Sequence, residues 1–268
     1  MPNNQITSLH SPHVERVKAL LGSRGKKVRQ TEKEFIADGI QTVREALTTS
    51  FADAPELINL YVTEKGFAKL EEEIDSEILA GAPVVHVSDA VMAEMADTES
   101  PQGILALCKF TEITLYKIKQ REAKRIAFFW EIQDPGNSGT VIRTAEALGF
   151  DAVVFSKNSV DVYAPKTVRA TVGALWHIPV VENVAVEELM EFAVAEGFYT
   201  IALAGDGSGT IVDLPKSDKT ILIFGNEARG LPEVAGVDSR VAIPMKGKSE
   251  SLNVASAAAI AMFEVGIR

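Results

Sequence analysis

The chain has 268 residues, of which 46% are hydrophobic and 24% are charged, and its formal net charge is −10 at pH 7. This is the composition of a folded globular protein with one large or two modest domains. No apolar run approaches the ~18 residues that span a bilayer, and the N-terminus lacks the apolar core of a secretory signal. The single cysteine, Cys108, excludes an intrachain disulfide framework and fits a reducing compartment. We therefore expect a cytoplasmic protein.

The acidic total taken alone argues against a nucleic-acid partner, but the charge is unevenly distributed. Residues 14–33 carry seven Lys or Arg against two Glu, which gives this stretch a local charge of +5. The basic residues are Arg16, Lys18, Arg24, Lys26, Lys27, Arg29 and Lys33. Such a cluster is either a solvated face or a surface that contacts phosphates.

Strands and helices are expected to alternate over the first 115 residues. Ser11-Pro12 predicts the start of a helix that ends near Gly22, and Asp38-Gly39 separates a short apolar run from a second helix. The other expected elements are strands at 56–63, 83–89 and 103–110 and helices at 66–80 and 90–97. This alternation predicts a small α/β/α sandwich. The polar and basic residues 116–124 are the best candidate for a linker to a second domain.

From residue 125 onward the pattern becomes more apolar. Continuous apolar runs, which are typical of buried parallel strands, lie at 125–132, 151–156, 177–181, 198–204, 219–225 and 239–245. Helices are expected between them at 138–149, 166–174 and 185–197. We therefore predict an α/β domain with a parallel sheet over residues 125–268. Its last helix is rich in alanine from Ala255 to Ala261, so another backbone could approach it closely.

Three polar segments follow predicted strands, at the strand ends where ligands bind in open parallel sheets. The first segment, 133–140, contains two glycines, a proline and Asn137, and it leads into a helix that carries Arg143. An ion pair between Arg143 and Glu146 is the structural alternative to a functional role for this arginine.

The second and third segments also combine glycine with polar side chains. The second, 224–232, contains two glycines, which permit close backbone approach, and Asn226 and Glu227 supply acceptors. The third, 244–253, ends at the start of the alanine-rich helix, where backbone N–H groups are free. An ordinary connecting loop rarely needs all of these features together.

As a set, the three segments resemble the three motifs of the SpoU (TrmH-like) branch of the SPOUT RNA methyltransferases. The matching stretches are 137–145, 224–231 and 243–255, with a further match at 165–174. The first half of the chain resembles, less closely, the substrate-binding domain attached to many members, which is similar to ribosomal proteins that bind kinked RNA. The resemblance implies an RNA substrate-binding domain at 1–115, a linker at 116–124 and a SPOUT methyltransferase domain at 125–268.

The resemblance also implies a function: transfer of a methyl group from S-adenosylmethionine (AdoMet) to a ribose 2′-hydroxyl of RNA. It implies a trefoil knot in the C-terminal domain and a homodimer through that knotted region. The implied catalytic or supporting residues are Arg143, Asn137, Glu227, Ser251 and Asn253. AdoMet is expected to contact Ala204, Gly205, Phe224, Gly225, Asn226, Gly230, Ile243, Met245, Ser251 and Leu252. RNA is expected to bind the seven basic residues of 14–33, and no metal is expected.

Several alternatives stay open at this point. Arg143 is either the base that takes the proton of the ribose hydroxyl or an anchor for the adjacent phosphate, and a guanidinium normally stays protonated. Large-subunit ribosomal RNA is preferred to transfer RNA as the substrate because of the N-terminal domain. The rival functions are an RNA-binding module without catalysis and an enzyme that methylates a base.

Overall fold

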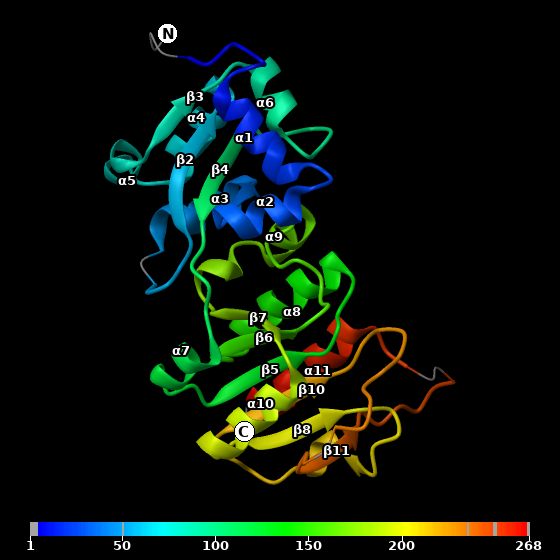
Figure 1. Cartoon of the computed structure of the whole chain (residues 1–268). Coiled ribbons are helices and arrows are strands. Elements are labelled where there is room, and N and C mark those ends of the chain that lie inside the picture. The colour runs from blue at the N-terminus through cyan, green and yellow to red at the C-terminus, as the bar shows by residue number, and fades with distance from the viewer. Residues whose placement is uncertain (1–4, 50, 235, 249–250, 267–268) are drawn as a thin grey trace. The chain divides into compact units, whose positions relative to one another are not determined.

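The computed structural model describes residues 5–49, 51–234, 236–248 and 251–266. The chain divides into two compact units (Figure 1). The first unit comprises residues 1–111 and 163–177, and the second comprises residues 112–162 and 178–268. Within the described ranges, no helix combines the length and the hydropathy that a membrane span requires.

The first unit is built on a four-stranded sheet in the order β1-β4-β2-β3. β4 pairs antiparallel with β1 and β2, whereas β2 pairs parallel with β3. The strands are β1 (Glu34–Asp38), β2 (Glu56–Val62), β3 (Val84–His86) and β4 (Ile104–Lys109). The helices are α1 (Pro12–Leu21), α2 (Gly25–Glu32), α3 (Ile40–Thr48), α4 (Glu64–Glu73), α5 (Ser76–Gly81), α6 (Asp89–Met95), α9 (Pro165–Thr171) and the 3-10 turn η1 (Ala174–Trp176).

Side chains alternate between the two faces of this sheet and so divide the core into two layers. On one face, Ile36 and Leu105 pack in a cluster with the buried sides of α1 and α6. On the other face, the ring of Phe35 lies 5.0 Å from the ring of Tyr163 and 5.8 Å from that of Trp176. The unit is therefore the α/β/α sandwich that the alternation predicted, but part of one helical layer comes from residues 163–177.

The second unit is built on a seven-stranded sheet in the order β7-β6-β5-β10-β8-β11-β9. Every strand pairing in it is parallel, as predicted. The strands are β5 (Arg125–Phe129), β6 (Ala152–Ser156), β7 (Val180–Val184), β8 (Tyr199–Leu203), β9 (Gly209–Thr210), β10 (Thr220–Phe224) and β11 (Ser239–Ala242). The helices are α7 (Leu115–Gln120), α8 (Pro135–Ala147), α10 (Val186–Glu196), α11 (Val254–Gly266) and the 3-10 turn η2 (Ile211–Asp213).

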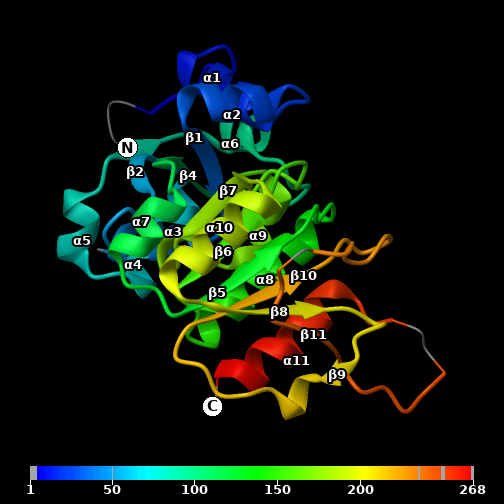
Figure 2. The ribbon, with the colours of Figure 1, turned by 60° about the horizontal axis from the view of Figure 1, so that its bottom comes forward.

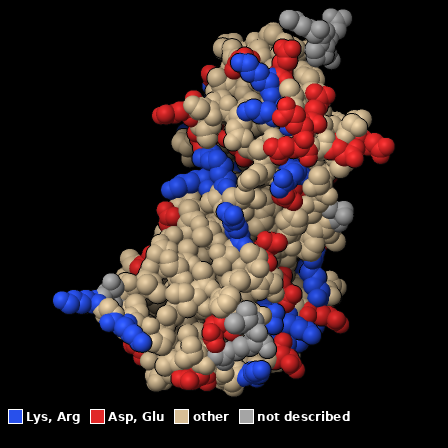
Figure 3. All heavy atoms as spheres, turned by 180° about the vertical axis from the view of Figure 1, so that it is seen from behind, with Lys and Arg blue, Asp and Glu red and all other residues tan. Residues whose placement is uncertain are grey.

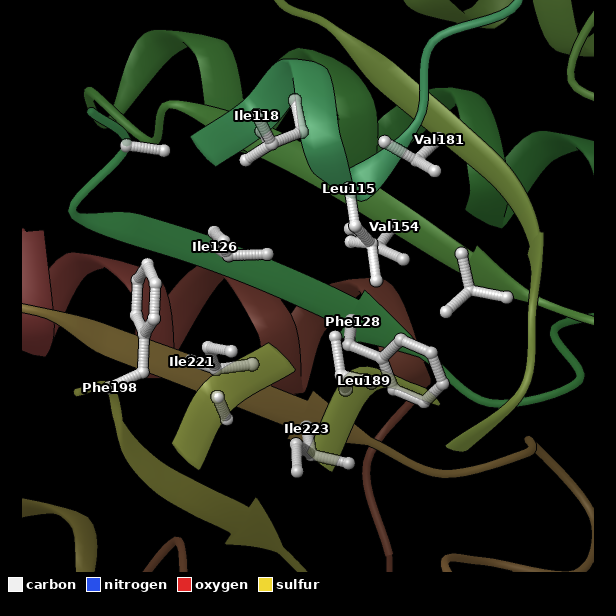
Figure 4. Close-up of a cluster of buried hydrophobic side chains, with 14 of the residues drawn as sticks. Leu115, Ile118, Ile126, Phe128, Val154, Val181, Leu189, Phe198, Ile221 and Ile223 are labelled. Carbon is white, nitrogen blue, oxygen red and sulfur yellow. The ribbon is translucent and has the colours of Figure 1, made fainter. Parts of the chain in front are cut away.

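One face of this sheet is covered by α7 and α10 (Figure 4). Leu115 and Ile118, three residues apart on one side of α7, are buried beside Ile126 of β5. The stretch 116–124, expected to be a linker, thus contains most of a helix that belongs to the core of the second unit. Its polar and basic residues concealed this role, because within 116–124 only Ile118 and Ala123 belong to the buried core cluster.

The opposite face carries α8 and α11, which pack against each other, and Figure 2 shows α10 and α11 on opposite sides of β8 and β10. Ala258 and Ala261 of α11 are fully buried. Small side chains let two helices approach closely, and this is the close approach that the alanine-rich segment predicted. The ring of Phe129 stacks on that of Phe224 at 4.8 Å beneath these helices.

Some boundaries differ from those expected. The helix predicted at 66–80 is two helices, because Asp75 caps a new one by accepting the N–H of Glu77. α8 begins at Pro135 rather than residue 138, since Asp134 accepts the N–H of Asn137 and proline suits the first helical position. Residues 249–250 of the third polar segment and the last two residues of the chain lie outside the described residues.

Candidate functional site

The loops after β8, β10 and β11 and the start of α11 surround a cavity of about 430 Å³ and an adjoining hollow of about 150 Å³. All ten residues predicted to contact the cofactor line one or both of them. Ala204, Gly205, Phe224, Gly225, Asn226, Gly230, Ser251 and Leu252 line the larger cavity, and Ile243 and Met245 line the hollow. The structure therefore gathers the residues from three separate segments into one place.

The loop after β10 is held together mainly by Asn226, which is 6% exposed. Its side-chain oxygen accepts the N–H groups of Ala228 and Arg229 at 2.9 and 3.0 Å, and its side-chain nitrogen donates to the carbonyl of Glu131 at 2.7 Å. Its backbone exchanges two hydrogen bonds with Gly230. The side chain of Asn226 thus builds the wall of the cavity, and its hydrogen-bonding groups are used within the protein.

Two glycines of the cavity have different physical reasons to be glycine. A Cβ atom at Gly225 would overlap the backbone of Gly230 and Leu231, so this glycine is required by the close approach of its own loop. A Cβ atom at Gly205 would meet no protein atom within 4 Å. The space beside Gly205 therefore belongs to the cavity, where a ligand could use it.

Three predicted catalytic or supporting residues form a hydrogen-bonded chain at the edge of this cavity. Asn253 donates from Nδ2 to Oδ1 of Asn137 at 3.0 Å, and Asn137 donates from Nδ2 to Oε1 of Glu227 at 3.3 Å. Asn253 also caps α11, because its Oδ1 accepts the N–H groups of Ala255 and Ser256. The chain joins the N-termini of α8 and α11 to the loop after β10.

The other two predicted residues lie outside this chain. Ser251 is exposed and lines both cavities. Arg143 lies six residues after Asn137 on α8, about 240° further around the helix axis, and its side chain is exposed. With the described residues it forms neither a hydrogen bond nor an ion pair, so the alternative pairing with Glu146 is not formed.

Two arginines outside the predicted set also line the larger cavity. Arg240 of β11 pairs with Asp206 at 2.9 Å and donates to the carbonyl of Leu231 at 3.2 Å. Arg229 pairs with Glu131 and lies over the ring of Trp130 at 5.3 Å. An arginine inside an apolar strand run, as at position 240, was the available signal for the first of them.

The predicted RNA-contacting residues fall into two groups. Arg16 pairs with Glu34, Lys18 pairs with Glu94, and Arg29 is buried with its guanidinium donating to the carbonyl of Leu20, so these three have partners within the first unit. Lys33 lies over the ring of Phe110 at 5.9 Å. The remaining three, Arg24, Lys26 and Lys27, are exposed at the start of α2. Among the described residues, no group of three or more His, Cys, Asp or Glu could hold a metal ion.

Residues 124–263 match the SpoU rRNA Methylase family, and residues 14–106 match the MRM3-like substrate binding domain. The chain is 33% identical to a 23S rRNA (guanosine(2553)-2'-O)-methyltransferase of Bacillus subtilis, over 90% of this chain and 91% of that protein. It is 30% identical to a 23S rRNA (uridine(2479)-2'-O)-methyltransferase of Streptomyces viridochromogenes, over 97% of this chain and 91% of that protein.

Solved structures agree with these matches. An AdoMet-bound rRNA methyltransferase from Sinorhizobium meliloti superposes with a TM-score of 0.83 at 28% identity, over 98% of this chain and 97% of that chain. The SpoU methyltransferase AviRb from Streptomyces viridochromogenes, in complex with AdoMet, gives a TM-score of 0.80 at 25% identity, over 96% of this chain and 98% of that chain. The chain therefore belongs to the SpoU rRNA methylase family.

Proposed function

We propose that this protein transfers the methyl group of AdoMet to a ribose 2′-hydroxyl of RNA and that its substrate is large-subunit ribosomal RNA. The observation that carries the proposal is the gathering of ten residues from three segments around the larger cavity and its adjoining hollow, with Asn137, Glu227 and Asn253 hydrogen-bonded at the edge. The two relatives above are named as 23S rRNA 2'-O-methyltransferases. Both structures described above hold AdoMet.

The cavity suits AdoMet in size and in chemistry. Its volume of about 430 Å³ falls within the range of small-molecule sites. Leu203, Leu231 and Leu252 supply apolar surface, and the loops after β8 and β10 form most of the remaining wall. The open space beside Gly205 leaves room for a ligand against the backbone. When bound, AdoMet supplies an electrophilic methyl group.

We assign positioning roles to Asn137, Glu227 and Asn253. Methyl transfer is an in-line displacement, so the protein contributes chiefly by holding the ribose hydroxyl in line. The hydrogen-bonded chain fixes both helix starts and the loop after β10 relative to the cavity. Ser251, two residues before Asn253, is exposed, lines the cavity and carries the hydroxyl of the predicted catalytic set.

We assign Arg143 to the substrate phosphate rather than to proton removal. Its side chain is exposed and has no ion pair with the described residues, so it is available to an anion. A guanidinium stays protonated in proteins, and it binds phosphate through two parallel hydrogen bonds. A bound phosphate next to the reacting ribose would then place the hydroxyl.

The test is single-turnover methylation of large-subunit rRNA, followed by digestion of the product to nucleosides. We expect a 2′-O-methyl nucleoside, and a base-methylated nucleoside would contradict the proposal. Calorimetry with AdoMet separates an enzyme from a binding module, since the latter need not bind it. Arg143→Ala should lower the rate by about 100-fold or more, whereas Lys157→Ala, which removes an exposed charge elsewhere in the unit, should not. A rate within a few-fold of wild type for Arg143→Ala would remove Arg143 from the site.

Assembly and topology belong to the same proposal. We propose a homodimer through the C-terminal region, because Ile260 and Phe263 of α11 are 43% and 53% exposed. Figure 3 shows a broad area without charged side chains on the second unit.

We also propose the trefoil knot. The chain path supports it, because β11 lies between β8 and β9 in the sheet and the chain then continues to α11, which packs on α8. The rRNA substrate would place the activity in the cytoplasm.

The division of labour along the chain is also a proposal. We assign residues 1–115 to RNA binding and residues 125–268 to methyl transfer. The match of residues 14–106 to a substrate binding domain supports the first assignment. Arg24, Lys26 and Lys27 are the exposed members of the predicted basic set and are the ones that we carry forward as phosphate contacts.

A further inference from the structure

The first unit contains a second cavity, of about 450 Å³, at the carboxyl end of β1. It is lined by the start of α3, the loop before β4 and the end of α9, and all of its lining residues belong to the first unit. No catalytic, cofactor-binding or RNA-binding role was predicted from the sequence for any of them. Arg169 and Val172 reach this cavity from the stretch that matches the SpoU methylase family.

The start of α3 offers unused hydrogen-bond donors to this cavity. Gly39 precedes the helix with a φ of 95° and has no side chain to cap it. The side-chain oxygen of Gln102 accepts the N–H of Ile40 at 3.1 Å. The next two N–H groups, of Gln41 and Thr42, have no partner among the described residues.

The hydroxyl of Thr42 is a further unused group. Thr42 is 3% exposed and lines the cavity, yet its side chain forms no hydrogen bond with the described residues. The hydroxyl oxygen itself is accessible from the cavity, because every fully buried side-chain polar atom among the described residues has a hydrogen-bond partner and this oxygen has none. Buried polar groups normally have hydrogen-bond partners, so the unpaired hydroxyl of Thr42 is evidence for a ligand in the cavity.

The carboxylate that lines this cavity is that of Asp38 at the end of β1. Thr98 donates to it at 3.4 Å. Arg169, the one guanidinium among the described residues that line the cavity, pairs with Asp97 at 3.1 Å. Two carboxylates thus stand against one guanidinium, which disfavours a free phosphate and favours a neutral ligand that offers an N–H to Asp38 and a carbonyl to the helix start.

The backbone beside the cavity is strained. Val172 lines the cavity and has φ 51° and ψ 37°, in the left-handed region that a β-branched residue rarely occupies. Gly173 follows with φ 94°, and a Cβ atom there would overlap the side chain of Glu45. Such strain clusters at ligand sites, where the surrounding structure holds it in place.

We propose that this cavity binds one unpaired nucleobase of the RNA through an edge with an N–H next to a carbonyl, the edge that guanine and uracil share. Asp38 accepts the N–H of the base, and the start of α3 with the Thr42 hydroxyl donates to its carbonyl. Adenine and cytosine have no such ring N–H, so they cannot satisfy Asp38 in the same way. Proteins read RNA sequence mostly from unpaired bases in this manner. The choice of RNA as the ligand rests on the proposed function.

The test uses the full chain and four fluorescein-labelled heptaribonucleotides, CCCXCCC, in which X is G, U, A or C. Binding is measured by fluorescence anisotropy for wild type, Asp38→Asn, Thr42→Val and the control Glu71→Gln, an exposed carboxylate on α4. We expect the G and U oligonucleotides to bind wild type and the control about tenfold more tightly than the A and C oligonucleotides. Asp38→Asn keeps one acceptor oxygen but loses the charge and adds an NH₂ donor, so it should weaken this preference, and Thr42→Val should also reduce it.

Equal binding of the four oligonucleotides to wild type, or no binding of any, would overturn the proposal. A preference that is undiminished in Asp38→Asn would do the same. Circular dichroism of each variant checks that it is folded, and Thr42→Val is nearly isosteric, which keeps the test valid if Asp38→Asn fails to fold. Calorimetry with AdoMet on the same samples reports on the second unit, so a failure of the methyltransferase proposal is distinguishable from a failure of this one.

Discussion

Asn253 has two separable roles at the edge of the larger cavity, because its two side-chain atoms serve different partners. Its oxygen caps α11, and its nitrogen donates to Asn137. Asn253→Ala should lower the free energy of unfolding by about 1 kcal/mol through the lost cap, whereas Asn253→Ser should preserve most of that stability. Both should slow methylation, since both lose the bond to Asn137. Thermal unfolding and single-turnover rates measure the two effects, and a wild-type rate for Asn253→Ser would show that this bond is dispensable.

Asp38 should make the stability of the protein depend on pH. Burial raises the pKa of its carboxyl, while Arg169 nearby and the hydrogen bond from Thr98 lower it, and Asp97 adds to the rise. In the folded protein the carboxyl of Asp38 therefore stays protonated to a higher pH than its ordinary pKa of about 3.9. As pH rises through the window from that value to the raised one, the unfolded state ionises more readily and stability falls.

Asp38→Asn should remove this loss of stability. Relative to wild type, its melting temperature should show no gain near pH 3 and a gain that grows through the window and then stays constant toward pH 7. Scanning calorimetry at several pH values measures it, with Glu71→Gln as the control for the loss of one carboxylate. A gain of the same size at every pH would show that ionisation of Asp38 is not its origin.

At the scale of the loops, the two cavity glycines should respond differently to a methyl group. Gly225→Ala forces the loop after β10 away from Gly230 and Leu231, so we expect about 1–3 kcal/mol of lost stability and weaker AdoMet binding. Gly205→Ala meets no protein atom within 4 Å, so its stability should stay within about 0.5 kcal/mol of wild type. If AdoMet occupies the space beside Gly205, that variant should still bind it more weakly in calorimetry. Unchanged affinity would place AdoMet elsewhere in the cavity.

These loops also show what the sequence could predict about the site. The strands were recognisable because buried parallel strands read as apolar runs, and two of the three polar segments at strand ends, 224–232 and 244–253, line the larger cavity or its adjoining hollow. The ten individual lining residues were implied by the family resemblance, and the structure places all ten at these two hollows. The role of Asn226 could not be predicted, because its use as a loop brace depends on the carbonyl of Glu131, 95 positions away. The place of Arg143 depends on helix phase, which residue type alone does not reveal.

The limits of the sequence are clearest at the scale of the whole chain. Residues 163–177 lie between strands of the second unit in sequence, yet they pack in the first. Trp176 is fully buried there and donates from its indole N–H to the carbonyl of Pro55 at 3.0 Å, and His177 pairs with Glu45 at 2.9 Å. Such contacts join positions more than 100 residues apart, so local periodicity carries no signal of them. Deletion of residues 1–115 would remove the residues that bury Trp176. Point variants are therefore better tests of RNA binding than this truncation.

The oligomeric state gives a test that belongs to the molecule as a whole. Exposed large apolar side chains that lie in line mark surfaces that a partner covers, and Ile260 and Phe263, three residues apart, share one side of α11. Phe263→Asp places a charge on that side and should convert a dimer into a monomer in analytical ultracentrifugation. Val194→Asp on α10, at a position 79% exposed on the opposite face of the sheet, should leave the dimer intact. A monomeric wild type would refute the dimer, and a dimer that persists in Phe263→Asp would place its interface on another surface.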